Sequence, residues 1–457
     1  MYTPDLTAGY GLMTDLYQLT MAAGYYCAAQ ETRATFELSI RGMPPRRSYL
    51  VAAGLGPAVE YLLNLRFHRE EIDYLATLPV FKHVPKAFFE YLATLRFTGN
   101  VWAVPEGTVV FDREPLMQIE APIVEAQIVE TFLLSVVQYE TLVASKASRV
   151  VQAARGKGVV DFGSRRAHGP EAGIHAARAS YIGGCLGTSN VRAGKLFGIP
   201  VYGTMAHSWV LTFESELEAF ERFSDLFPEA TFLLVDTYDV EQGILNAVRF
   251  GRRLKGIRLD SGDLLQWSLT ARKLLDAAGL EAALIMASGD LNEYRIDELL
   301  RRGAPIDLFG VGTDLVTSRD EPALGAIYKL VETRSRGRAR PCAKLSEGKV
   351  TYPGRKQIWR CRDAKGCYRK DVVAALEEAP PEDAEGLLVP ILVEGKLAGP
   401  LPTVSEARNR CLEEVLRLPA RYRTVRRTAP YPVNMSPGLT RFSRTGGKGD
   451  SSPSCSS

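Results

Sequence analysis

Short apolar runs alternate with amphipathic stretches through the middle of the chain, from about residue 156 to residue 317. Each run ends in polar or glycine-rich residues, and the runs cover residues 158–161, 199–202, 231–235, 256–259, 284–287 and 306–309. They recur roughly every 20 to 30 residues, the length of a strand plus a crossover helix. Between them, apolar residues three and four apart predict helices at 169–186, 240–253, 265–278 and 292–302.

This repetition of strand and helix predicts a parallel sheet and an α/β fold class. Such a sheet is either open and doubly wound or closed into a (β/α) barrel, and in both the ligand binds at the carboxyl ends of the strands. We favour the barrel, because polar side chains follow at least five of the strand ends. A nucleotide-binding open sheet would concentrate its glycines in one early loop.

The flanking segments carry other patterns. Residues 33–40 alternate as a strand does, a second strand is predicted at 102–111, and a helix is predicted at 405–418 after Thr403. Beyond residue 332 the sequence reads as hairpins separated by Pro and Gly. The predicted parts are an N-terminal α+β part (1–115), a barrel-like catalytic domain (116–332), a C-terminal segment packing back on the N-terminal part (333–430) and a disordered tail (431–457).

Composition narrows the class of protein. The chain has 457 residues, 46% of them hydrophobic, which is enough for two or three globular domains. No run approaches the roughly 18 apolar residues of a membrane span and no secretory leader is recognisable, so we expect a cytoplasmic protein that does not bind membranes. The seven cysteines are scattered, and Cys361 and Cys367 fit a hairpin better than a zinc site. Two basic clusters, at 334–340 and 421–427, lack interleaved aromatic residues, which argues against nucleic acid as a partner.

The segment 256–263, GIRLDSGD, is the most informative strand end. Arg258 and Asp260 are two residues apart, so on a strand their side chains point to the same face. Asp260 and Asp263 are candidate ligands of Mg²⁺ or of ribose hydroxyls. The alternative is structural, with Ser261 or Asp263 capping the next helix.

Two glycine-rich turns are candidate phosphate sites. Such turns offer backbone N–H groups followed by a helix N-terminus, and their residues are Ser288, Gly289 and Asp290 in one and Gly310, Gly312 and Thr313 in the other. Arg165, Arg166 and Arg258 could pair with a carboxylate or a phosphate, which predicts an anionic ligand. Ordinary turns and local ion pairs are the alternatives.

His207 and Tyr17 are further candidates. His207 is one of only five histidines and stands at the polar end of an apolar run, where it could be a nucleophile or an acid/base group rather than a structural residue. Tyr17 lies in a predicted N-terminal helix. Its pattern alone favours a core aromatic residue.

Several of these segments, in order, resemble the nicotinate phosphoribosyltransferase family. They are 14–18 (TDLYQ), 161–169 (DFGSRRAHG), 203–209 (GTMAHSW), 256–263 (GIRLDSGD), 309–313 (FGVGT) and 328–330 (YKL). The resemblance runs through nearly the whole chain, except the tail after about Pro437. It implies an irregular (β/α) barrel of the type II phosphoribosyltransferase kind, with a second α+β domain built from the N-terminal and C-terminal segments.

The resemblance also implies an activity. Such enzymes join nicotinate to 5-phosphoribosyl 1-diphosphate for NAD synthesis and couple the reaction to ATP hydrolysis. His207 would be the histidine that ATP phosphorylates, Tyr17, Thr204 and Arg258 would contact substrate, and Asp260 with Mg²⁺ would stabilise developing charge. Phe162 and Tyr17 would sandwich the pyridine ring, with Tyr17 supplied by a partner subunit. The expected assembly is therefore a homodimer with shared active sites.

Substrate choice and activity class stay open at this stage. The nicotinamide-using relative resembles this chain but has an acidic residue where Ser189 stands. The absence of that carboxylate here favours an anionic substrate. Nicotinamide or quinolinate phosphoribosyltransferase is the nearest alternative. A barrel lyase or isomerase acting on a sugar phosphate would need a central lysine or carboxylate pair, and a catalytically dead paralogue would not need intact His207, Arg258 and Asp260.

Overall fold

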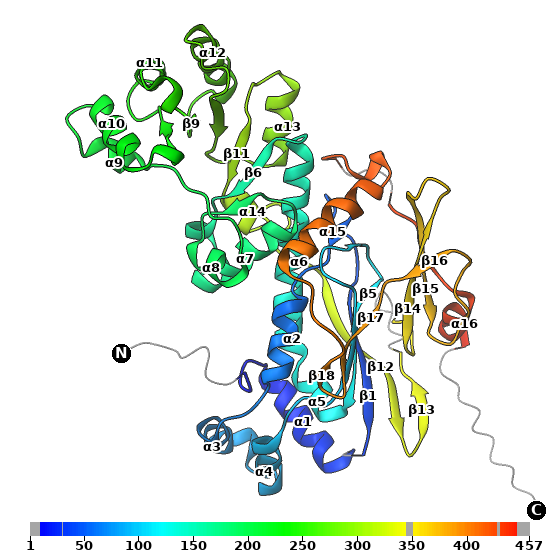
Figure 1. Ribbon diagram of the computed structural model, residues 1–457. Coiled ribbons are helices and arrows are strands. Elements are labelled where there is room, and N and C mark those ends of the chain that lie inside the picture. The colour runs from blue at the N-terminus through cyan, green and yellow to red at the C-terminus, as the bar shows by residue number, and fades with distance from the viewer. Residues whose placement is uncertain (1–9, 30, 344–350, 427–429, 446–457) are drawn as a thin grey trace, which may run out of the picture.

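The middle of the chain forms a parallel sheet, as predicted. The computed structural model describes residues 10–29, 31–343, 351–426 and 430–445 (Figure 1). The strands are β6 (Gly158–Asp161), β7 (Gly187–Thr188), β8 (Phe232–Leu234), β9 (Gly256–Leu259), β10 (Leu284–Ala287) and β11 (Leu308–Val311). Their order is β7-β6-β11-β10-β9-β8, and every neighbouring pair is parallel. The α/β prediction is confirmed.

The crossover helices agree with the apolar pattern to within a few residues. They include α7 (Pro170–Ile182), α11 (Val240–Val248), α12 (Leu264–Ala277) and α13 (Glu293–Arg301). The helix expected to reach residue 186 ends at Ile182, because Gly183 and Gly184 follow and Gly184 has a φ of 109°. A left-handed glycine is a common helix terminator.

Two strand predictions need correction. Residues 199–202 form no strand, and Val201 makes only an isolated bridge to Thr188. The strand that follows α7 is β7, which the apolar pattern missed because it is two residues long. The strand expected at 306–309 is β11, two residues later, where Gly310 pairs with Val160 of β6.

The sheet curves as an irregular barrel that backbone pairing does not close. The bridge at Val201 extends the sheet beyond β7, and no ladder joins this end to β8 within the described residues. Side chains span the gap instead: Thr204 accepts a hydrogen bond from Arg258 of β9, and His207 contacts Thr237 after β8. Closure at this point therefore depends on the polar residues at the strand ends.

The N-terminal part is built on a second sheet, in which every neighbouring pair is antiparallel, drawn at the lower right of Figure 1. Its order is β13-β12-β1-β5-β3-β17-β18, and the strands are β1 (Arg33–Ile40), β3 (Asn100–Ala103), β5 (Pro115–Pro122), β12 (Ala326–Ser335), β13 (Arg338–Pro341), β17 (Val389–Val393) and β18 (Lys396–Leu397). The helices of this part are α1 (Leu16–Ala28), α2 (Leu55–Asn64), α3 (Arg69–Thr77), α4 (Lys86–Thr94), α5 (Ile123–Ile128) and α6 (Glu130–Ala153). Strands from both ends of the chain thus share one sheet.

The single strand predicted at 102–111 is wrong. The segment contributes β3 to the large sheet and β4 (Val109–Val110), which pairs with β2 (Leu50–Val51) in a separate two-stranded sheet. Pro105 and Gly107, whose φ is 86°, make the turn between them. An apolar run cannot reveal a change of sheet, because both strands are buried.

The C-terminal segment forms a four-stranded sheet and the helix α15 (Val404–Arg417), which begins at a capping box of Thr403 and Glu406. Its strands are β14 (Lys356–Arg362), β15 (Tyr368–Ala375), β16 (Ala384–Gly386) and β19 (Val433–Met435). The disorder expected from residue 431 is wrong for the first part of that tail, since β19 pairs with β15 and α16 (Pro437–Thr445) follows. Residues 446–457 lie outside the described part. None of the described helices has the length and apolar character of a membrane span.

Candidate functional site

The carboxyl ends of the parallel strands bring most of the predicted residues together. Arg258 lies on β9 and is 13% exposed. Its guanidinium donates to Thr204 Oγ1 over 2.5 Å and to the Met205 carbonyl over 3.3 Å, and it lies 3.3 Å from Asp260 Oδ1. Its buried Nε has no hydrogen-bond partner among the described residues. The Arg258 guanidinium is therefore held at the rim formed by the carboxyl ends of the parallel strands, and its Nε–H remains available to a ligand.

Asp260 follows β9 and is joined to the next strand end. Its Oδ1 accepts a short hydrogen bond from Ser288 Oγ, which follows β10. Burial alone would raise the pKa of Asp260, but the Ser288 hydrogen bond and the nearby Arg258 charge hold it below its usual range. Asp260 is thus a fixed carboxylate in a rim that is otherwise rich in cations.

Asp236 is a site residue that sequence reasoning missed. It follows β8, its side chain is fully buried, and its Oδ2 accepts from the Asp260 backbone N–H over 3.0 Å and from Ser261 Oγ over 2.6 Å. Its Oδ1 has no hydrogen-bond partner in the described structure and lies 3.9 Å from His207 Nε2. Its position after an apolar run was the available signal, since the other site residues occupy the same place after their strands.

His207 begins the short helix α9 (His207–Leu211) and is 40% exposed. Its Nδ1 lies 3.1 Å from Thr237 Oγ1, and its Nε2 lies 3.8 Å from Asp260 Oδ2 and 3.9 Å from Asp236 Oδ1. The imidazole is therefore oriented by a hydroxyl on one side and faces two carboxylates on the other. That arrangement suits a histidine that accepts and releases a group.

Phe162 supplies a flat apolar surface next to these residues. A Cβ at Gly310 would lie 2.4 Å from the Phe162 ring, so only glycine lets the ring rest against β11. The preceding residue, Asp161, is buried and accepts from Gly163 N–H and from Thr188 Oγ1, both over 2.7 Å. Burial raises the pKa of Asp161 to about 6 despite these hydrogen bonds. Asp161 thus ties β6, β7 and the turn after β6 together.

The two predicted phosphate turns lie side by side, since a Cβ at Gly310 would come within 3.3 Å of Ser288 Cβ. Gly289 and Asp290 both have positive φ, 86° and 44°. A Cβ at Gly289 would meet the Asp260 carbonyl at 2.1 Å, so the turn after β10 depends on this glycine. Thr313 begins the four-residue helix α14 (Thr313–Val316) after Gly312. A single anionic group could reach both turns.

Arg165 and Arg166 lie in the 3₁₀ turn η2 (Ser164–Arg166) directly after Phe162. Both side chains are exposed and make no ion pair with the described residues. The alternative of local ion pairs is therefore not seen for these two arginines in the described part of the chain. They add positive charge to the same rim.

Asp263 has a structural role. Its Oδ1 accepts from the backbone N–H of Leu265 and of Gln266, so it caps α12. Mg²⁺ in phosphate-handling sites commonly binds one or two carboxylates together with substrate phosphate and water. The donor set that fits this chemistry is Asp260 with Asp236, whose Oδ1 has no hydrogen-bond partner among the residues that the structure describes. No cluster of three or more metal-binding side chains occurs in the described residues.

Tyr17 is not brought to this rim by its own chain. Its hydroxyl donates to Glu130 at the start of α6 over 3.0 Å, and burial and the Glu130 charge raise the pKa of Tyr17 to about 12. Figure 1 shows α1 at the lower end of the molecule, away from β6, β9 and β11. The side chain is 49% exposed. The tyrosine is therefore neutral and available to another surface.

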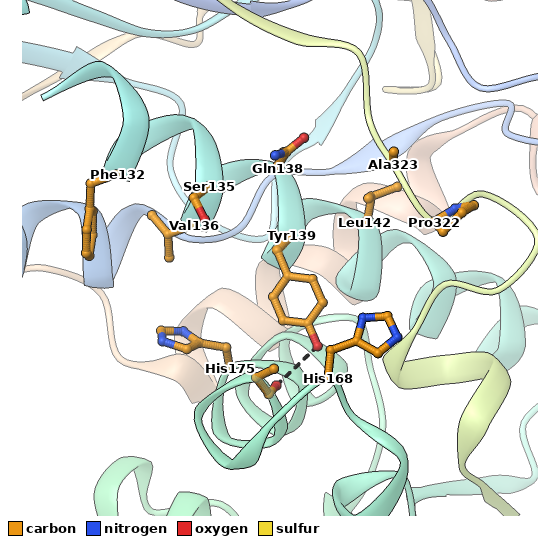
Figure 2. Close-up of a pocket in the computed structure, with 11 residues that line it drawn as sticks. Phe132, Ser135, Val136, Gln138, Tyr139, Leu142, His168, His175, Pro322 and Ala323 are labelled. Carbon is orange, nitrogen blue, oxygen red and sulfur yellow. Dashed lines mark hydrogen bonds between the residues drawn. The ribbon is translucent and has the colours of Figure 1, made fainter. Parts of the chain in front are cut away.

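A cavity of about 440 Å³ lies between α6, α7 and the loop at Pro322 (Figure 2). Figure 2 shows His168 and His175 on either side of the Tyr139 hydroxyl, which donates to the carbonyls of Ala172 and Val316. Because Val316 belongs to α14, Tyr139 connects the wall of this cavity to the second phosphate turn. The site residues themselves lie outside its lining.

Three family models match the chain in order. They are the nicotinate phosphoribosyltransferase (NAPRTase) N-terminal domain at residues 12–138, the NAPRTase family at 158–366 and the nicotinate phosphoribosyltransferase C-terminal domain at 380–443. The chain is also similar to curated nicotinate phosphoribosyltransferases. It is 47% identical to that of Mycobacterium tuberculosis (93% of this chain, 91% of that protein) and 40% identical to that of Bacillus subtilis (93% and 92%).

Solved structures agree in fold. The crystal structure of human nicotinic acid phosphoribosyltransferase is similar with a TM-score of 0.84 and 31% identity, covering 94% of this chain and 99% of that chain. The crystal structure of nicotinate-nucleotide pyrophosphorylase from Pyrococcus furiosus has a TM-score of 0.72 and 26% identity, covering 89% and 95%. Both similarities include the parallel sheet and the antiparallel sheet, because each covers nearly the whole chain.

Proposed function

The chain belongs to the nicotinate phosphoribosyltransferase family, and from this we propose that it joins nicotinate to 5-phosphoribosyl 1-diphosphate. The products are nicotinate mononucleotide and diphosphate, on the salvage route to NAD. The observation that carries the proposal is the single rim where Arg258, Asp260, His207 and two glycine turns meet. An aromatic anion and a phosphorylated sugar are the ligands that such a rim suits.

Nicotinate binding needs an apolar plane and a cation. Phe162 offers the plane, since its ring is fixed against Gly310. Arg258 offers the cation, and its Nε, which has no partner in the described part of the chain, leaves a donor for a carboxylate. Thr204, already bonded to Arg258, lies at the same end. Arg165 adds a second, exposed positive charge that attracts the anion.

Displacement of diphosphate at the ribose C1 develops positive charge on the sugar and negative charge on the leaving group. Asp260 stays ionised because its pKa is low, so it can stabilise the sugar cation. The turns at Ser288–Gly289–Asp290 and Gly310–Gly312–Thr313 present backbone N–H groups to phosphate. Mg²⁺ held by Asp260 and Asp236 would neutralise negative charge on the diphosphate.

ATP coupling is the second element of the proposal. With Nδ1–H donating to Thr237 Oγ1, His207 Nε2 keeps its lone pair and can attack the γ-phosphorus of ATP. The new bond is Nε2–P, the bond that breaks joins phosphorus to the β–γ bridging oxygen, and ADP leaves. Hydrolysis of phosphohistidine then returns the imidazole. Phosphate carried beside Asp260 would change the charge of the rim and so the affinity for the phosphoribosyl donor.

The active site would be completed by a second copy of the chain. Tyr17 is half-exposed and neutral, and its helix α1 lies away from β6, the strand that precedes Phe162 (Figure 1). We expect the partner's Tyr17 to form the second wall of the nicotinate site. A homodimer with shared active sites follows. A mixture of Tyr17→Ala and His207→Asn subunits should recover the ATP-stimulated turnover that neither variant has alone.

Diphosphate release tests the activity. Wild-type protein is assayed with 5-phosphoribosyl 1-diphosphate, Mg²⁺ and nicotinate, nicotinamide or quinolinate in turn, with and without ATP. We expect turnover of nicotinate alone, stimulated by ATP. Turnover of nicotinamide or quinolinate instead would assign a sister activity, and no release from any of the three would refute the proposal.

Ser189 provides a test of substrate choice. It is half-buried after β7, where its backbone N–H donates to the Asp161 carbonyl. Ser189→Asp adds a carboxylate that repels the nicotinate carboxylate, so nicotinate turnover should fall on the order of tenfold or more while nicotinamide turnover rises. Ser189→Asn is the uncharged control. Unchanged nicotinate turnover in Ser189→Asp would show that Ser189 does not determine substrate choice.

A further inference from the structure

Six charged side chains form a buried network behind the two phosphate turns. This buried ion network consists of Arg47, Lys146, Arg149, Glu293, Asp314 and Asp320. Three are cations and three are anions, so the network is neutral. All six are at least 87% buried, and no step proposed above uses them.

Lys146 is the centre of the network. It lies on α6, is 1% exposed, and its Nζ is 2.6 Å from Glu293 Oε2, 2.9 Å from Asp320 Oδ1 and 3.8 Å from Asp314 Oδ1. A lysine carries three donors. One ammonium group therefore faces carboxylates that belong to two different strand ends.

The carboxylates stand directly behind the two turns. Glu293 is the first residue of α13 and follows the turn of Ser288, Gly289 and Asp290 by three residues. Asp314 is adjacent to Thr313 in α14, and Asp320 follows four residues after the end of that helix. Both turns are thus anchored through Lys146 to the same point on one long helix.

Arg47 and Arg149 fix the outer ends of the network. Arg47 is fully buried and donates to both carboxylate oxygens of Asp320, over 2.7 and 3.0 Å, and to Ser318 Oγ over 3.0 Å. Ser318 has a φ of 42°, unusual for a residue with a side chain, and Arg47 secures it. Arg149 donates to Glu293 Oε1 over 3.0 Å.

The cations of the buried ion network stabilise the ionised form of its carboxylates. Burial would raise the pKa of Asp320, but the hydrogen bonds and charges of Arg47 and Lys146 hold it well below its usual range. The Asp314 pKa is raised by burial, which Lys146 and Arg319 only partly offset. Removal of Lys146 would leave an excess buried negative charge and would push the two anchored segments apart.

We propose that Lys146, through Glu293, Asp314 and Asp320, is a positioning residue that sets the spacing of the two glycine turns and thereby the affinity for the phosphate of the phosphoribosyl donor. The proposal rests on the function proposed above. The turns must be close enough to share one phosphate, and a Cβ added at Gly310 would lie only 3.3 Å from Ser288 Cβ. Lys146 does not itself contact the ligand, so its effect is indirect.

The test compares Lys146→Met with a matched control, Lys356→Met. Lys356 is equally buried, and its Nζ lies 2.8 Å from Glu37 Oε2, but it belongs to the contact between β14 and β1. Both variants remove one buried lysine and leave carboxylate behind, so both should lower the melting temperature. Only Lys146→Met should raise KM for 5-phosphoribosyl 1-diphosphate, on the order of tenfold, with KM for nicotinate and kcat changed less than threefold.

Binding measurements separate this proposal from the proposed function. Calorimetry with ribose 5-phosphate needs no turnover, and Lys146→Met should weaken its Kd on the order of tenfold relative to Lys356→Met. Wild-type binding without turnover would refute the function and leave the positioning role. Equal Kd and KM values in the two variants would overturn the positioning role. No binding to wild-type protein would overturn both.

Two further variants keep the test decisive if Lys146→Met does not fold. Asp314→Asn changes a less buried member that is 3.8 Å from Lys146, and it should raise KM for the phosphoribosyl donor severalfold at little cost in stability. Adding Glu293→Gln to Lys146→Met restores neutrality and should recover part of the lost affinity. Failure of both effects would contradict the role of the network.

Discussion

Two arginines of this chain pair with carboxylates in very different ways. Arg360, on β14, is fully buried, its Nε and NH2 bind Asp371, its NH1 binds Glu414, and the Tyr368 ring lies 4.5 Å away. Arg258, on β9, also faces a carboxylate, but its buried Nε has no hydrogen-bond partner among the described residues and its side chain is 13% exposed. The arginine of the Arg360–Asp371 pair has its hydrogen-bond donors occupied, whereas the arginine of the Arg258–Asp260 pair has a donor without a partner among the described residues.

The difference in hydrogen bonding between Arg360 and Arg258 indicates which of the two arginines can bind a ligand. A saturated buried ion pair can only be broken, which destabilises the fold. An ion pair at the carboxyl ends of a parallel sheet that still has an unused hydrogen-bond donor or acceptor can form new bonds with a ligand. Within the described residues, His207, Asp236 and Arg258 each have a group that lacks a hydrogen bond or a close charge partner. We therefore expect substitutions at the strand ends to affect turnover and substitutions around Arg360 to affect stability.

The largest effect is expected from Asp260→Asn. The amide keeps the shape but removes the charge that would stabilise the ribose cation, so kcat should fall on the order of a thousandfold. The melting temperature should change little, because Ser288 can still donate to the amide oxygen. Asp371→Asn is the matched change beside Arg360 and should show the reverse, a lower melting temperature with kcat kept within threefold.

His207→Asn should remove the ATP effect. Asparagine cannot be phosphorylated as histidine is, so incubation with ATP labelled at the γ-phosphate should leave no acid-labile phosphate on the variant. At low concentrations of the phosphoribosyl donor, turnover should fall on the order of 10- to 100-fold to the level seen without ATP. His68→Asn, at the N-cap of α3, is the control. Label retained by His207→Asn would place the phosphate elsewhere.

Asp161 gives a pH-dependent prediction. Its pKa rises from 3.8 to about 6 in the folded protein, so the folded state holds this proton more tightly than the unfolded chain does. Its contribution to stability is therefore present below about pH 4 and declines as the pH rises through 6, by about 3 kcal/mol at most. Asp161→Asn should lack this slope. The free energies of unfolding of both proteins, measured in urea from pH 4 to pH 7, would contradict the assignment if they ran parallel.

The smallest effect is expected from Thr237→Val. Valine keeps the volume but cannot bond His207 Nδ1, so the ring loses its fixed orientation. Phosphorylation of His207 by ATP should slow about two- to fivefold, with KM for nicotinate unchanged. A rate equal to wild type would mean that Asp236 and Asp260 are sufficient to orient the ring.

The sequence predicted the parallel part of the molecule well for a physical reason. In a parallel sheet each strand is an apolar run and each carboxyl end is polar, so both the fold and the site follow one pattern. The places of Arg258, Asp260, Ser288 and Gly310 at the strand ends were predicted in this way. Asp236 occupies the same position but was overlooked, because a strand end alone does not reveal which oxygen lacks a partner.

Other features of the fold could not be predicted from the pattern of apolar and polar residues. The strand β7 is too short to give an apolar run, and the change of sheet between β3 and β4 occurs between two strands that both contribute buried apolar residues. The tail prediction failed because β19 is stabilised by pairing with β15 and α16 packs against the same strand, which the composition of the tail does not reveal. Asp263 was predicted as either a metal ligand or a cap, and only the coordinates placed its Oδ1 on the backbone of α12.

The most direct test of the comparison is a paired measurement on Arg258→Gln and Arg360→Gln. For each variant, kcat/KM for nicotinate and the melting temperature are determined under the same conditions. The account predicts that Arg258→Gln loses turnover on the order of a hundredfold or more with a nearly unchanged melting temperature. Arg360→Gln should lose about 3–5 kcal/mol of stability while its folded fraction keeps wild-type turnover. Wild-type turnover in Arg258→Gln, or lost turnover in a stable Arg360→Gln, would contradict it.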